Sequence, residues 1–324
     1  MKLLIPGGAG YIGSHMTKYA QEKGHEVVVL DDFSTGHQWA VRGCEVLPVN
    51  LLDQDKLRKL LRGRTFDAVI HFAAKSLVGE SVTQPDVYYR NNVVGTLNLV
   101  QEMLRNDIND LVFSSTAAIF GHPETDKIAE SHAKRPINPY GQSKLMVEHI
   151  LEDICSAHDF NATCLRYFNA AGADHCGDIG EAHEPETHLI PNILKSVLGG
   201  GDVLKVFGDD YDTADGTCIR DYVHVSDLAQ AHLLALEQQP KKRGFCAYNL
   251  GNGQGFSVAE VIKACELVTG HSIDFTVVDR REGDPAILVA DSHLAANELG
   301  WRPQYERLET IVQSAWRWHK RGQS

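Results

Sequence analysis

The sequence has no lysine- and arginine-rich block and no apolar run long enough to cross a membrane. Its 43 acidic residues outnumber its 31 basic residues, so the formal net charge is −12 at pH 7. These features argue against nucleic acid and anionic membranes as partners, because both attract clustered positive charge. An anionic substrate would therefore require a local basic pocket.

Cysteine is never spaced as CxxC, and the seven cysteines are scattered and odd in number. This pattern argues against both a disulfide framework and a cysteine zinc site. Because the first strand is predicted to begin at residue 2, we expect no signal peptide and a location in the reducing cytoplasm. The sequence also lacks internal repeats, and its 324 residues with 43% hydrophobic content suffice for one large or two smaller domains.

The first 32 residues predict a strand, a glycine-rich turn, a helix and a second strand that ends in acidic residues. The turn contains four glycines: Gly7, Gly8, Gly10 and Gly13. Without Cβ atoms, Gly8 and Gly10 allow the backbone to approach a pyrophosphate, and Gly13 allows the helix to pack close to the strand. The start of the helix then offers free N–H groups to the phosphates.

Asp31 follows Gly13 by 18 residues, at the end of the second strand. A carboxylate there can accept hydrogen bonds from both hydroxyls of an adenosine ribose and would repel a 2′-phosphate, so NAD is favoured over NADP. The glycine spacing fits GxGxxG from Gly8 and equally GxxGxxG from Gly7. The second spacing is typical of short-chain dehydrogenase/reductases.

Further strands alternate with helices, which predicts an α/β fold with a Rossmann-type, doubly wound parallel sheet. We expect strands at 44–49, 67–73, 110–116 and 163–168, and helices at about 53–62, 86–106 and 139–158. In such sheets ligands bind beyond the carboxyl ends of the strands. The residues expected to face that crevice are 7–13, Asp31, 72–76, 114–116 and Asn169.

The composition changes after Asn169 to a long polar loop, which indicates a smaller, discontinuous second lobe. We expect residues 1–168 to bind NAD and residues 169–324 to bind the substrate. Residues 220–240 are predicted to return to the main sheet as a strand and helix. Further strands near 247–250 and 273–278 are expected within the second lobe.

Tyr140 and Lys144 are four residues apart at a predicted helix start, so they project from one helical face. An ammonium group beside a phenol, together with a cationic nicotinamide, favours the phenolate and lowers its pKa towards neutrality. Tyr140 could then act as a general base. Thr116, at the end of the strand 110–116, would hydrogen-bond the same substrate oxygen. The spacing alone also fits an exposed i,i+4 pair of side chains on any helix, but the glycine turn and the hydroxyl-bearing strand end favour a catalytic role.

With these motifs the chain resembles the extended short-chain dehydrogenase/reductase family, and within it the UDP-sugar 4-epimerases, from about residue 2 to residue 318. The motifs that carry the resemblance are Gly7-x-x-Gly10-x-x-Gly13, Asp31, HFAA at 71–74, Asn91-Asn92, SST at 114–116, Tyr140-x-x-x-Lys144, RYFNAAGA at 166–173, GTCIRDYVHVSDLA at 216–229 and RREGDPA at 280–286. The resemblance implies interconversion of UDP-glucose and UDP-galactose. Tyr140 would take the 4-hydroxyl proton while C4 gives hydride to NAD, and the 4-keto sugar would rotate before hydride returns.

The resemblance also implies the binding residues. Those expected to contact NAD are Gly7, Gly10, Tyr11, Ile12, Gly13, Asp31, Asp32, Asn50, Leu51, Phe72, Ala73, Asn91, Lys144 and Phe168. Those expected to contact the UDP-sugar are Thr116, Tyr140, Asn169, His188, Leu189, Phe207, Arg220, Arg281, Asp284 and Leu288. The two arginines would supply charge for the diphosphate, and Asp284 a carboxylate for a ribose hydroxyl. Lys75, one position before a lysine that typically reaches the cofactor, has no assigned role.

Leu288 stands beside the expected position of the sugar's C2 substituent. A bulky residue there excludes N-acetylated sugars and a small one admits them, so epimerisation of UDP-N-acetylglucosamine or a UDP-pentose is an alternative. A 4,6-dehydratase is disfavoured because Ala117 and Ala118, rather than an acid pair, follow Thr116. A non-catalytic NAD-binding sensor is the alternative from another class, although it would not need the catalytic residues.

Two further expectations concern metals and partners. In HEPETH, residues 183–188, the HExxxH spacing is not that of zincins and Pro185 interrupts a helix, so we expect no metal site. In the family, helices equivalent to 86–106 and 139–158 form a four-helix bundle between two subunits. A homodimer is therefore expected, although the same apolar faces could instead be intramolecular core.

Overall fold

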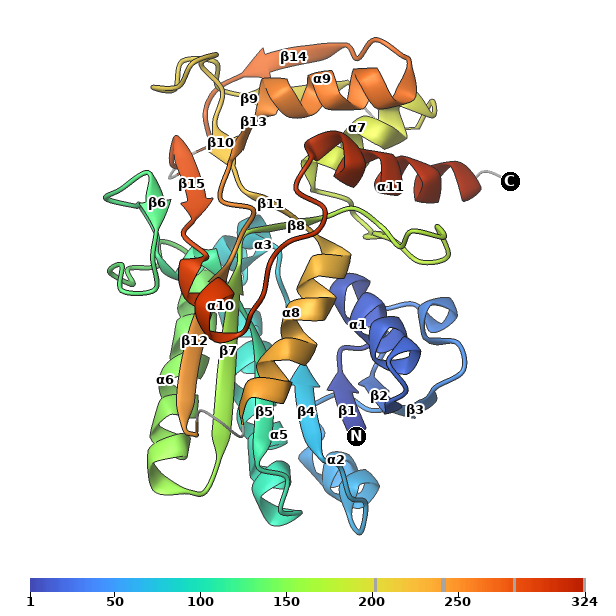
Figure 1. Ribbon diagram of the computed structural model, residues 1–324, viewed down its shortest axis with the longest axis vertical. Helices are drawn as coiled ribbons and strands as arrows, with labels where there is room; N and C mark the ends of the chain where they lie inside the picture. Colours follow the sequence, from blue (N-terminus) through green and yellow to red (C-terminus); the bar gives the residue numbers. More distant parts are fainter. Residues whose placement is uncertain (201–202, 240–242, 282–283, 323–324) are drawn as a thin grey trace.

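Seven strands form the central sheet of the computed structural model, which describes residues 1–200, 203–239, 243–281 and 284–322 (Figure 1). Across the sheet their order is β12 (Phe245–Leu250), β7 (Asn161–Tyr167), β5 (Asp110–Thr116), β4 (Ala68–His71), β1 (Lys2–Pro6), β2 (Glu26–Asp31) and β3 (Glu45–Pro48). Every neighbouring pair is parallel. This confirms the predicted doubly wound, Rossmann-type sheet.

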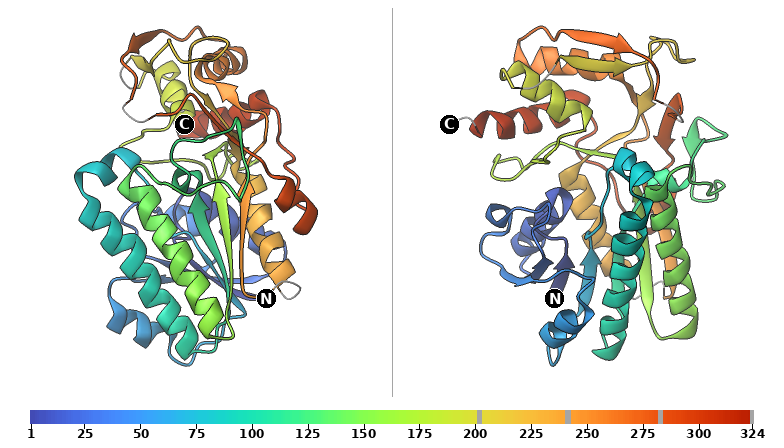
Figure 2. Two further views of the ribbon diagram at one scale, coloured as in Figure 1. Left: turned by 90° about the vertical axis from the view of Figure 1, so that its left-hand side faces the viewer. Right: turned by 180° about the vertical axis from the view of Figure 1, so that it is seen from behind.

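Helices cover both faces of this sheet (Figures 1 and 2). One face packs against α1 (Tyr11–Glu22) and α8 (Val225–Gln238), and the other against α2 (Gln54–Leu61), α5 (Gly95–Arg105) and α6 (Pro139–Ala157). Successive side chains of a strand point to opposite faces. In β1, Leu3 and Ile5 accordingly belong to the first core and Leu4 to the second, all fully buried. Because both faces are covered, the strands are continuous apolar runs.

The single helix expected at 86–106 is instead interrupted. The chain runs through α3 (Val78–Thr83), α4 (Pro85–Tyr88) and a π-helix, η2 (Tyr89–Val94), before α5 begins at Gly95. A π-turn changes the direction of the side chains that it carries. Within it the buried Asn92 side chain accepts from the Lys75 N–H at 2.9 Å and donates to the Lys75 carbonyl at 3.0 Å. The irregular turn therefore fixes the loop that follows β4.

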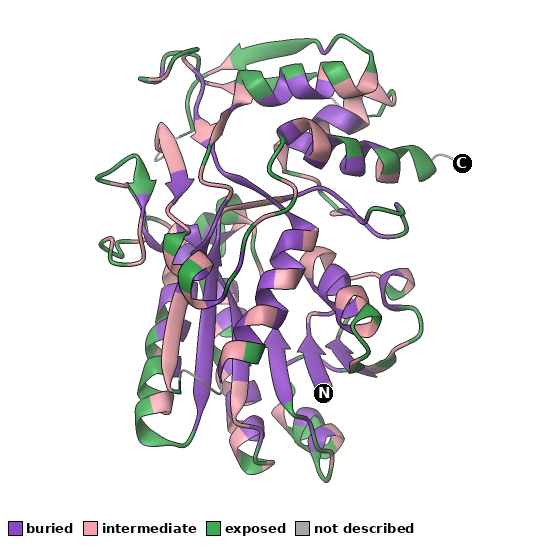
Figure 3. Cartoon of the chain, viewed as in Figure 1, coloured by how far each residue is buried: buried purple, intermediate pink, exposed green. Residues whose placement is uncertain are grey.

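The second lobe lies above the carboxyl ends of the sheet strands in Figure 1. Its helices α7 (Leu189–Val197), α9 (Val258–Thr269) and α11 (Leu308–Arg321) share an apolar core with β9 (Leu204–Phe207), which pairs with the more exposed β14 (Phe275–Val278). Figure 3 shows burial concentrated in the central strands and on the inner sides of these helices. Three further short helices in the described part of the chain are η1 (Gln38–Val41), η3 (Ala117–Ile119) and α10 (His293–Glu298).

Two small sheets join the lobes. One consists of β13 (Phe256–Ser257), β10 (Ile219–Arg220), β15 (Ile287–Ala290) and β6 (Lys127–Ile128), and the other of β8 (Asn169–Ala171) and β11 (Tyr222–His224). These strands come from distant parts of the sequence. They therefore bring residues around 220 and 288 close to the end of β5.

Two expectations about the second half of the chain are wrong. The strand β11 pairs with β8 and does not join the main sheet, although α8 does pack on that sheet. The strand β12, expected in the second lobe, is the edge strand of the main sheet, because all six of its residues pair along β7. Pro240, the last residue of the expected returning segment, lies outside the described residues. Among the described residues no helix is long and apolar enough to span a membrane.

Candidate active site

The glycine turn between β1 and α1 has no room for larger residues. A Cβ on Gly13 would lie 2.1 Å from the Gly7 carbonyl oxygen, and one on Gly7 would lie 2.3 Å from the Ala73 nitrogen. Gly7 also has a φ of +78°, which favours glycine. Helix α1 starts from Gly10 without a side-chain cap and without an acidic residue in its first turn. Its N-terminal N–H groups can therefore receive an anionic phosphate, so this turn fits the cofactor.

The two aspartates at the end of β2 organise the loops beside the turn. Asp31 is buried, and its carboxylate accepts hydrogen bonds from the N–H groups of Ala9 and Phe33, both at 2.9 Å. Burial raises the pKa of Asp31, and these two hydrogen bonds oppose that rise. Asp32 accepts from the Asn50 side-chain amide. The structure thus brings together Asp31, Asp32 and Asn50 next to the glycine turn, as predicted.

Other residues expected at the cofactor line the same edge. The Phe72 and Ala73 N–H groups donate to the Pro6 carbonyl, so the end of β4 lies against the turn. Tyr11 uses its hydroxyl for a 2.6 Å hydrogen bond to the Gly172 carbonyl. We therefore expect Tyr11 to contact the cofactor through its main-chain atoms. Ile12 packs beside the first core, Leu51 contacts Gly95, and Asn91 donates to the Asn92 side chain.

Thr116 and Tyr140 meet at the carboxyl end of β5. Asn138 caps α6 by accepting from the Gly141 N–H at 2.8 Å, which places Tyr140 in the first turn. Burial raises the pKa of Tyr140, while a hydrogen bond with the Thr116 side chain lowers it. The lowering of the Tyr140 pKa that was expected from Lys144 is not found for the protein chain alone. A further positive charge is needed to make Tyr140 an effective base near neutral pH.

Lys144 lies one helical turn beyond Tyr140 and is also buried. Its Nζ donates a 2.7 Å hydrogen bond to the Ser114 carbonyl and lies 4.7 Å from the centre of the Phe113 ring. Burial lowers the pKa of Lys144 to about 7. The predicted catalytic residues Thr116, Tyr140 and Lys144 therefore gather at one strand end, and Lys144 is held by the strand itself.

The residues expected to hold UDP also gather, although they come from separate segments. Arg220 of β10 forms an ion pair with Asp284 and donates to the Pro285 carbonyl at 2.8 Å. The guanidinium of Arg281 lies 4.0 Å from the centre of the Phe207 ring. Two positive charges thus occupy one corner, where a diphosphate would be favoured. Two residues of the expected 280–286 motif, at 282 and 283, lie outside the described residues.

Leu288 lies close to the strand end that carries Thr116. It pairs in register with Arg220 and packs, together with Phe168, on a small apolar cluster. The buried members of that cluster are Ala117, Ile119, Phe120, Ile128 and Leu145. Asn169 follows Phe168 and donates its N–H to the Asp221 carbonyl. The pairing of β10 with β15 therefore joins the UDP corner to the catalytic strand end.

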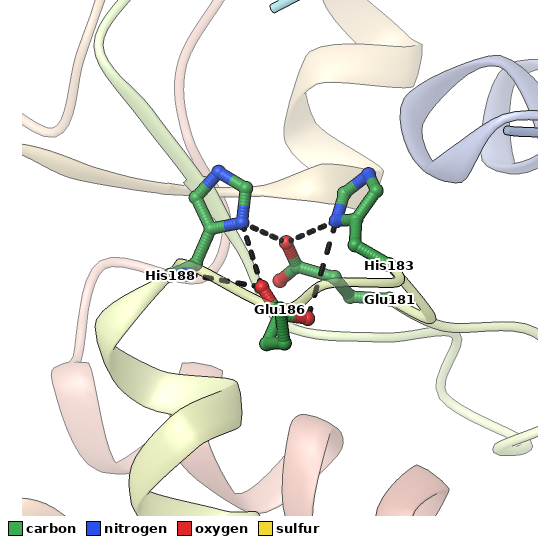
Figure 4. Close-up of side chains that lie close together, drawn as sticks. All are labelled: Glu181, His183, Glu186 and His188. Atoms are coloured by element: carbon green, nitrogen blue, oxygen red, sulfur yellow. Dashed lines mark hydrogen bonds and ion pairs between the residues drawn. The ribbon is translucent and has the colours of Figure 1, made fainter. Parts of the chain in front are cut away.

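His188 and Leu189 stand at the start of α7, where His188 is the N-cap residue. The His188 Nδ1 lies 2.7 Å from a Glu181 oxygen and 2.9 Å from a Glu186 oxygen, and the His183 Nδ1 lies 3.0 Å from Glu181 (Figure 4). Burial lowers the pKa of His188, but the two carboxylates outweigh it and raise the pKa to about 10. The sequence predicted a sugar contact for His188 and no metal site in HEPETH, and it gave no signal for Glu181, which lies outside that motif.

Supporting residues were also missed because their partners are distant in sequence. Glu148 and Arg166 are buried and form a two-point ion pair with distances of 2.9 and 2.6 Å. Glu148 also accepts from the Ser115 hydroxyl at 2.6 Å, directly beside Thr116. A buried pair of this kind fixes the strand end on α6. The only sign of this pair in the sequence was that Arg166 begins the motif RYFNAAGA at 166–173.

Comparison with known proteins now gives the family. Residues 3–251 match the sequence profile described as "Epimerase: NAD dependent epimerase/dehydratase family". The chain belongs to the NAD dependent epimerase/dehydratase family. The protein is therefore an enzyme, and NAD is its cofactor.

Several similar proteins are named UDP-glucose 4-epimerase. The chain is 50% identical to the UDP-glucose 4-epimerase of Halalkalibacterium halodurans, over 99% of this chain and 96% of that one. A crystal structure of UDP-glucose 4-epimerase from Brucella ovis in complex with NAD is 47% identical, covers 97% of each chain and has a TM-score of 0.94. The enzyme from Bifidobacterium longum in complex with NAD⁺ and UDP is 36% identical, with a TM-score of 0.94 over 100% of this chain and 99% of that chain.

Proposed function

We propose that this protein interconverts UDP-glucose and UDP-galactose by oxidising and re-reducing C4 of the sugar. One observation carries the proposal: Thr116, Tyr140 and Lys144 meet at the carboxyl end of β5, in the same parallel sheet whose strand β1 leads into the glycine turn. The names of the similar proteins support the same activity.

When bound, NAD supplies a hydride acceptor for the first half of the reaction and a hydride donor for the second. Tyr140 takes the proton of the 4-hydroxyl as the C4–H bond breaks, and the sugar becomes a 4-ketone. Thr116 holds the same oxygen by a hydrogen bond. After the sugar has rotated, Tyr140 returns the proton to the oxygen as the new C4–H bond forms. Protons and electrons therefore balance within each turnover.

The charged residues of the second lobe would hold the nucleotide while the sugar rotates. Arg220 and Arg281 neutralise the diphosphate, and Asp284 accepts from a ribose hydroxyl. His188 uses Nδ1 for the two carboxylates, which leaves Nε2 to donate to the substrate. We further propose that residues 1–168 hold NAD and that the segment from residue 169 to residue 324, apart from β12, holds the UDP-sugar.

The experiment uses the purified protein with no added NAD. UDP-galactose is incubated with it, and the anomeric protons of the sugar are followed by NMR. Conversion to UDP-glucose is expected, because a cofactor that is regenerated in each turnover stays bound. If UDP-galactose remains unchanged while bound NAD is found in the protein, the proposed activity is wrong.

A second candidate is 4-epimerisation of N-acetylated UDP-sugars. Leucine at position 288 is intermediate between a bulky and a small residue, and it packs beside the catalytic strand end. UDP-N-acetylgalactosamine is therefore tested in parallel. Conversion of both sugars indicates dual specificity, and conversion of UDP-galactose alone indicates a restrictive pocket.

We also propose that the enzyme is a homodimer in a reducing cytoplasm. On the π-helix and α6, Val94 and Met146 are exposed large hydrophobic residues. An interface on these helices would cover both of them. No cysteine in the described part of the chain forms a disulfide, which agrees with a reducing compartment.

A further inference from the structure

Four side chains with metal-binding atoms converge in the loop between β8 and α7: Glu181, His183, Glu186 and His188. One ligand atom from each lies within 4.8 Å of all the others. Both histidines present Nδ1 to the same carboxylate oxygen of Glu181, at 3.0 and 2.7 Å (Figure 4). The sequence alone predicted no metal here, because it suggested only an interrupted helix with non-zincin spacing. In the structure these four residues lie in a loop, so helical spacing does not limit whether they can bind one ion.

The buried carboxylates supply a second, independent observation. The side chains of Glu181 and Glu186 are only 5% and 3% exposed. Oxygen Oε2 of Glu186 is buried and makes no hydrogen bond within the described residues, and His183 Nδ1 and Lys195 Nζ each lie 4.0 Å from it. A buried carboxylate oxygen without a hydrogen bond is costly. A cation in the cluster would remove that cost.

We propose that Glu181, His183, Glu186 and His188 bind one divalent transition-metal ion of the zinc class. Two imidazole nitrogens and two carboxylate oxygens form a set that zinc accepts in tetrahedral geometry. Ligand bonds of about 2.0–2.1 Å place neighbouring ligand atoms about 3.3 Å apart. The distances between histidine nitrogens and carboxylate oxygens in the cluster, 2.7–4.0 Å, bracket that value. Magnesium and calcium are disfavoured because both prefer oxygen ligands.

Binding changes the protonation of the cluster but breaks no other bond. The ion replaces the protons that Nδ1 of each histidine shares with the carboxylates. His183 and His188 then carry their remaining proton on Nε2, and both carboxylates stay ionised. At His188 this fixes Nε2 as a hydrogen-bond donor.

The position of the cluster indicates what the ion would do. The ring of His183 meets the ring of Tyr11 edge to face, with centres 6.2 Å apart, and Tyr11 is the first residue of the helix behind the glycine turn. His188 caps α7 of the second lobe. The bound ion therefore holds the start of α7 beside the glycine turn. It acts as a structural clamp and takes no part in hydride transfer.

The test uses the holoenzyme with any histidine tag removed. The protein is dialysed against Zn²⁺, freed of unbound metal and analysed for zinc, and binding is measured by calorimetry. We expect about one Zn²⁺ per chain in the wild type. Glu181→Gln and His183→Gln should weaken binding at least about 10-fold, since even outer partners of metal ligands contribute that much.

The cluster of Asp174, His175 and Cys176, in which Asp174 is buried and the other two residues are exposed, offers a matched control within the same loop region. His175→Asn should bind Zn²⁺ as the wild type does, and Co²⁺ should give the strong visible absorption of a four-coordinate site only when His183 is present. Retained NAD and an unchanged circular dichroism spectrum establish that each variant is folded. The proposal is overturned if the wild type retains no Zn²⁺. It is equally overturned if the folded Glu181→Gln and His183→Gln variants bind like the wild type, or if His175→Asn removes binding.

Discussion

Lys144 on α6 donates a 2.7 Å hydrogen bond to the main-chain oxygen of Ser114, two residues before Thr116 on β5. This contact ties the helix that carries Tyr140 to the strand end that carries Thr116. The placement of the Thr116 and Tyr140 hydroxyls therefore depends on the buried side chain of Lys144.

Replacing Tyr140 by phenylalanine removes the group proposed to transfer the proton. Epimerase activity should fall by at least about 100-fold, the usual contribution of a positioned acid or base. Bound NAD and the circular dichroism spectrum should be unchanged. Tyr88→Phe is the matched control, because its ring lies 6.5 Å from that of Tyr140 but its hydroxyl bonds Leu77 and Glu80. Near-normal activity of Tyr140→Phe would remove this residue from the mechanism.

Replacing Lys144 by methionine should change how stability depends on pH. Burial lowers the pKa of Lys144 from 10.5 to about 7, so the unfolded chain binds more protons between these values. Lys144 should therefore make the free energy of unfolding rise with pH across this window. This rise should be absent from Lys144→Met. Urea unfolding of both proteins from about pH 7 to about pH 9.5 measures the difference. Identical pH dependence in the two proteins would contradict the assignment.

Arg220→Met should weaken binding of UDP at least about 10-fold, because a hydrogen bond to a charged group contributes about 1.5–3 kcal/mol. Isothermal titration calorimetry with UDP measures the effect. Arg280→Met is the matched control, since Arg280 pairs with the exposed Asp210 rather than with Asp284. Equal losses in both variants would mean that general positive charge, and not the position of Arg220, holds the nucleotide.

Leu288→Ala should enlarge the space beside the sugar's C2 substituent. The ratio of kcat/KM for UDP-N-acetylgalactosamine to that for UDP-galactose should rise about 10-fold, a typical effect of a small change in an apolar pocket. Ile287→Ala removes apolar volume from the adjacent strand position, which faces the other side, and should leave the ratio unchanged. The prediction fails if the two variants alter the ratio equally.

Met146→Glu on α6 should dissociate the proposed homodimer, because a charge would be buried in an apolar interface. Size-exclusion chromatography with light scattering should give the mass of one chain instead of two. Leu267→Glu, on the second-lobe helix α9, places the same charge on a residue that is 74% exposed and should leave the dimer intact. A wild-type protein with the mass of one chain would refute the dimer directly.

The local parts of the fold and site could be predicted from the sequence because their signals lie within a few residues of one another. The spacing of Gly7, Gly10 and Gly13 indicates a strand–turn–helix unit, and Tyr140 and Lys144 share a helical face at a fixed spacing. The interruption of the helix expected at 86–106 could not be predicted in this way. Its apolar pattern indicates one helix, whereas burial of the Asn92 amide against Lys75 produces a π-turn that periodicity does not reveal.

Tertiary structure alone decided which distant groups became partners. Glu148 on α6 meets Arg166 on β7, Arg220 on β10 meets Asp284 in the loop before β15, and Glu181 joins two histidines in a loop. Such pairs form because a buried charge requires an opposite charge, and only the packing of the chain determines which one is near. The sequence by itself determined the NAD turn, the catalytic spacing and the parallel sheet. The arrangement of the substrate corner and the Glu181 cluster followed from how the second lobe folds over the strand ends.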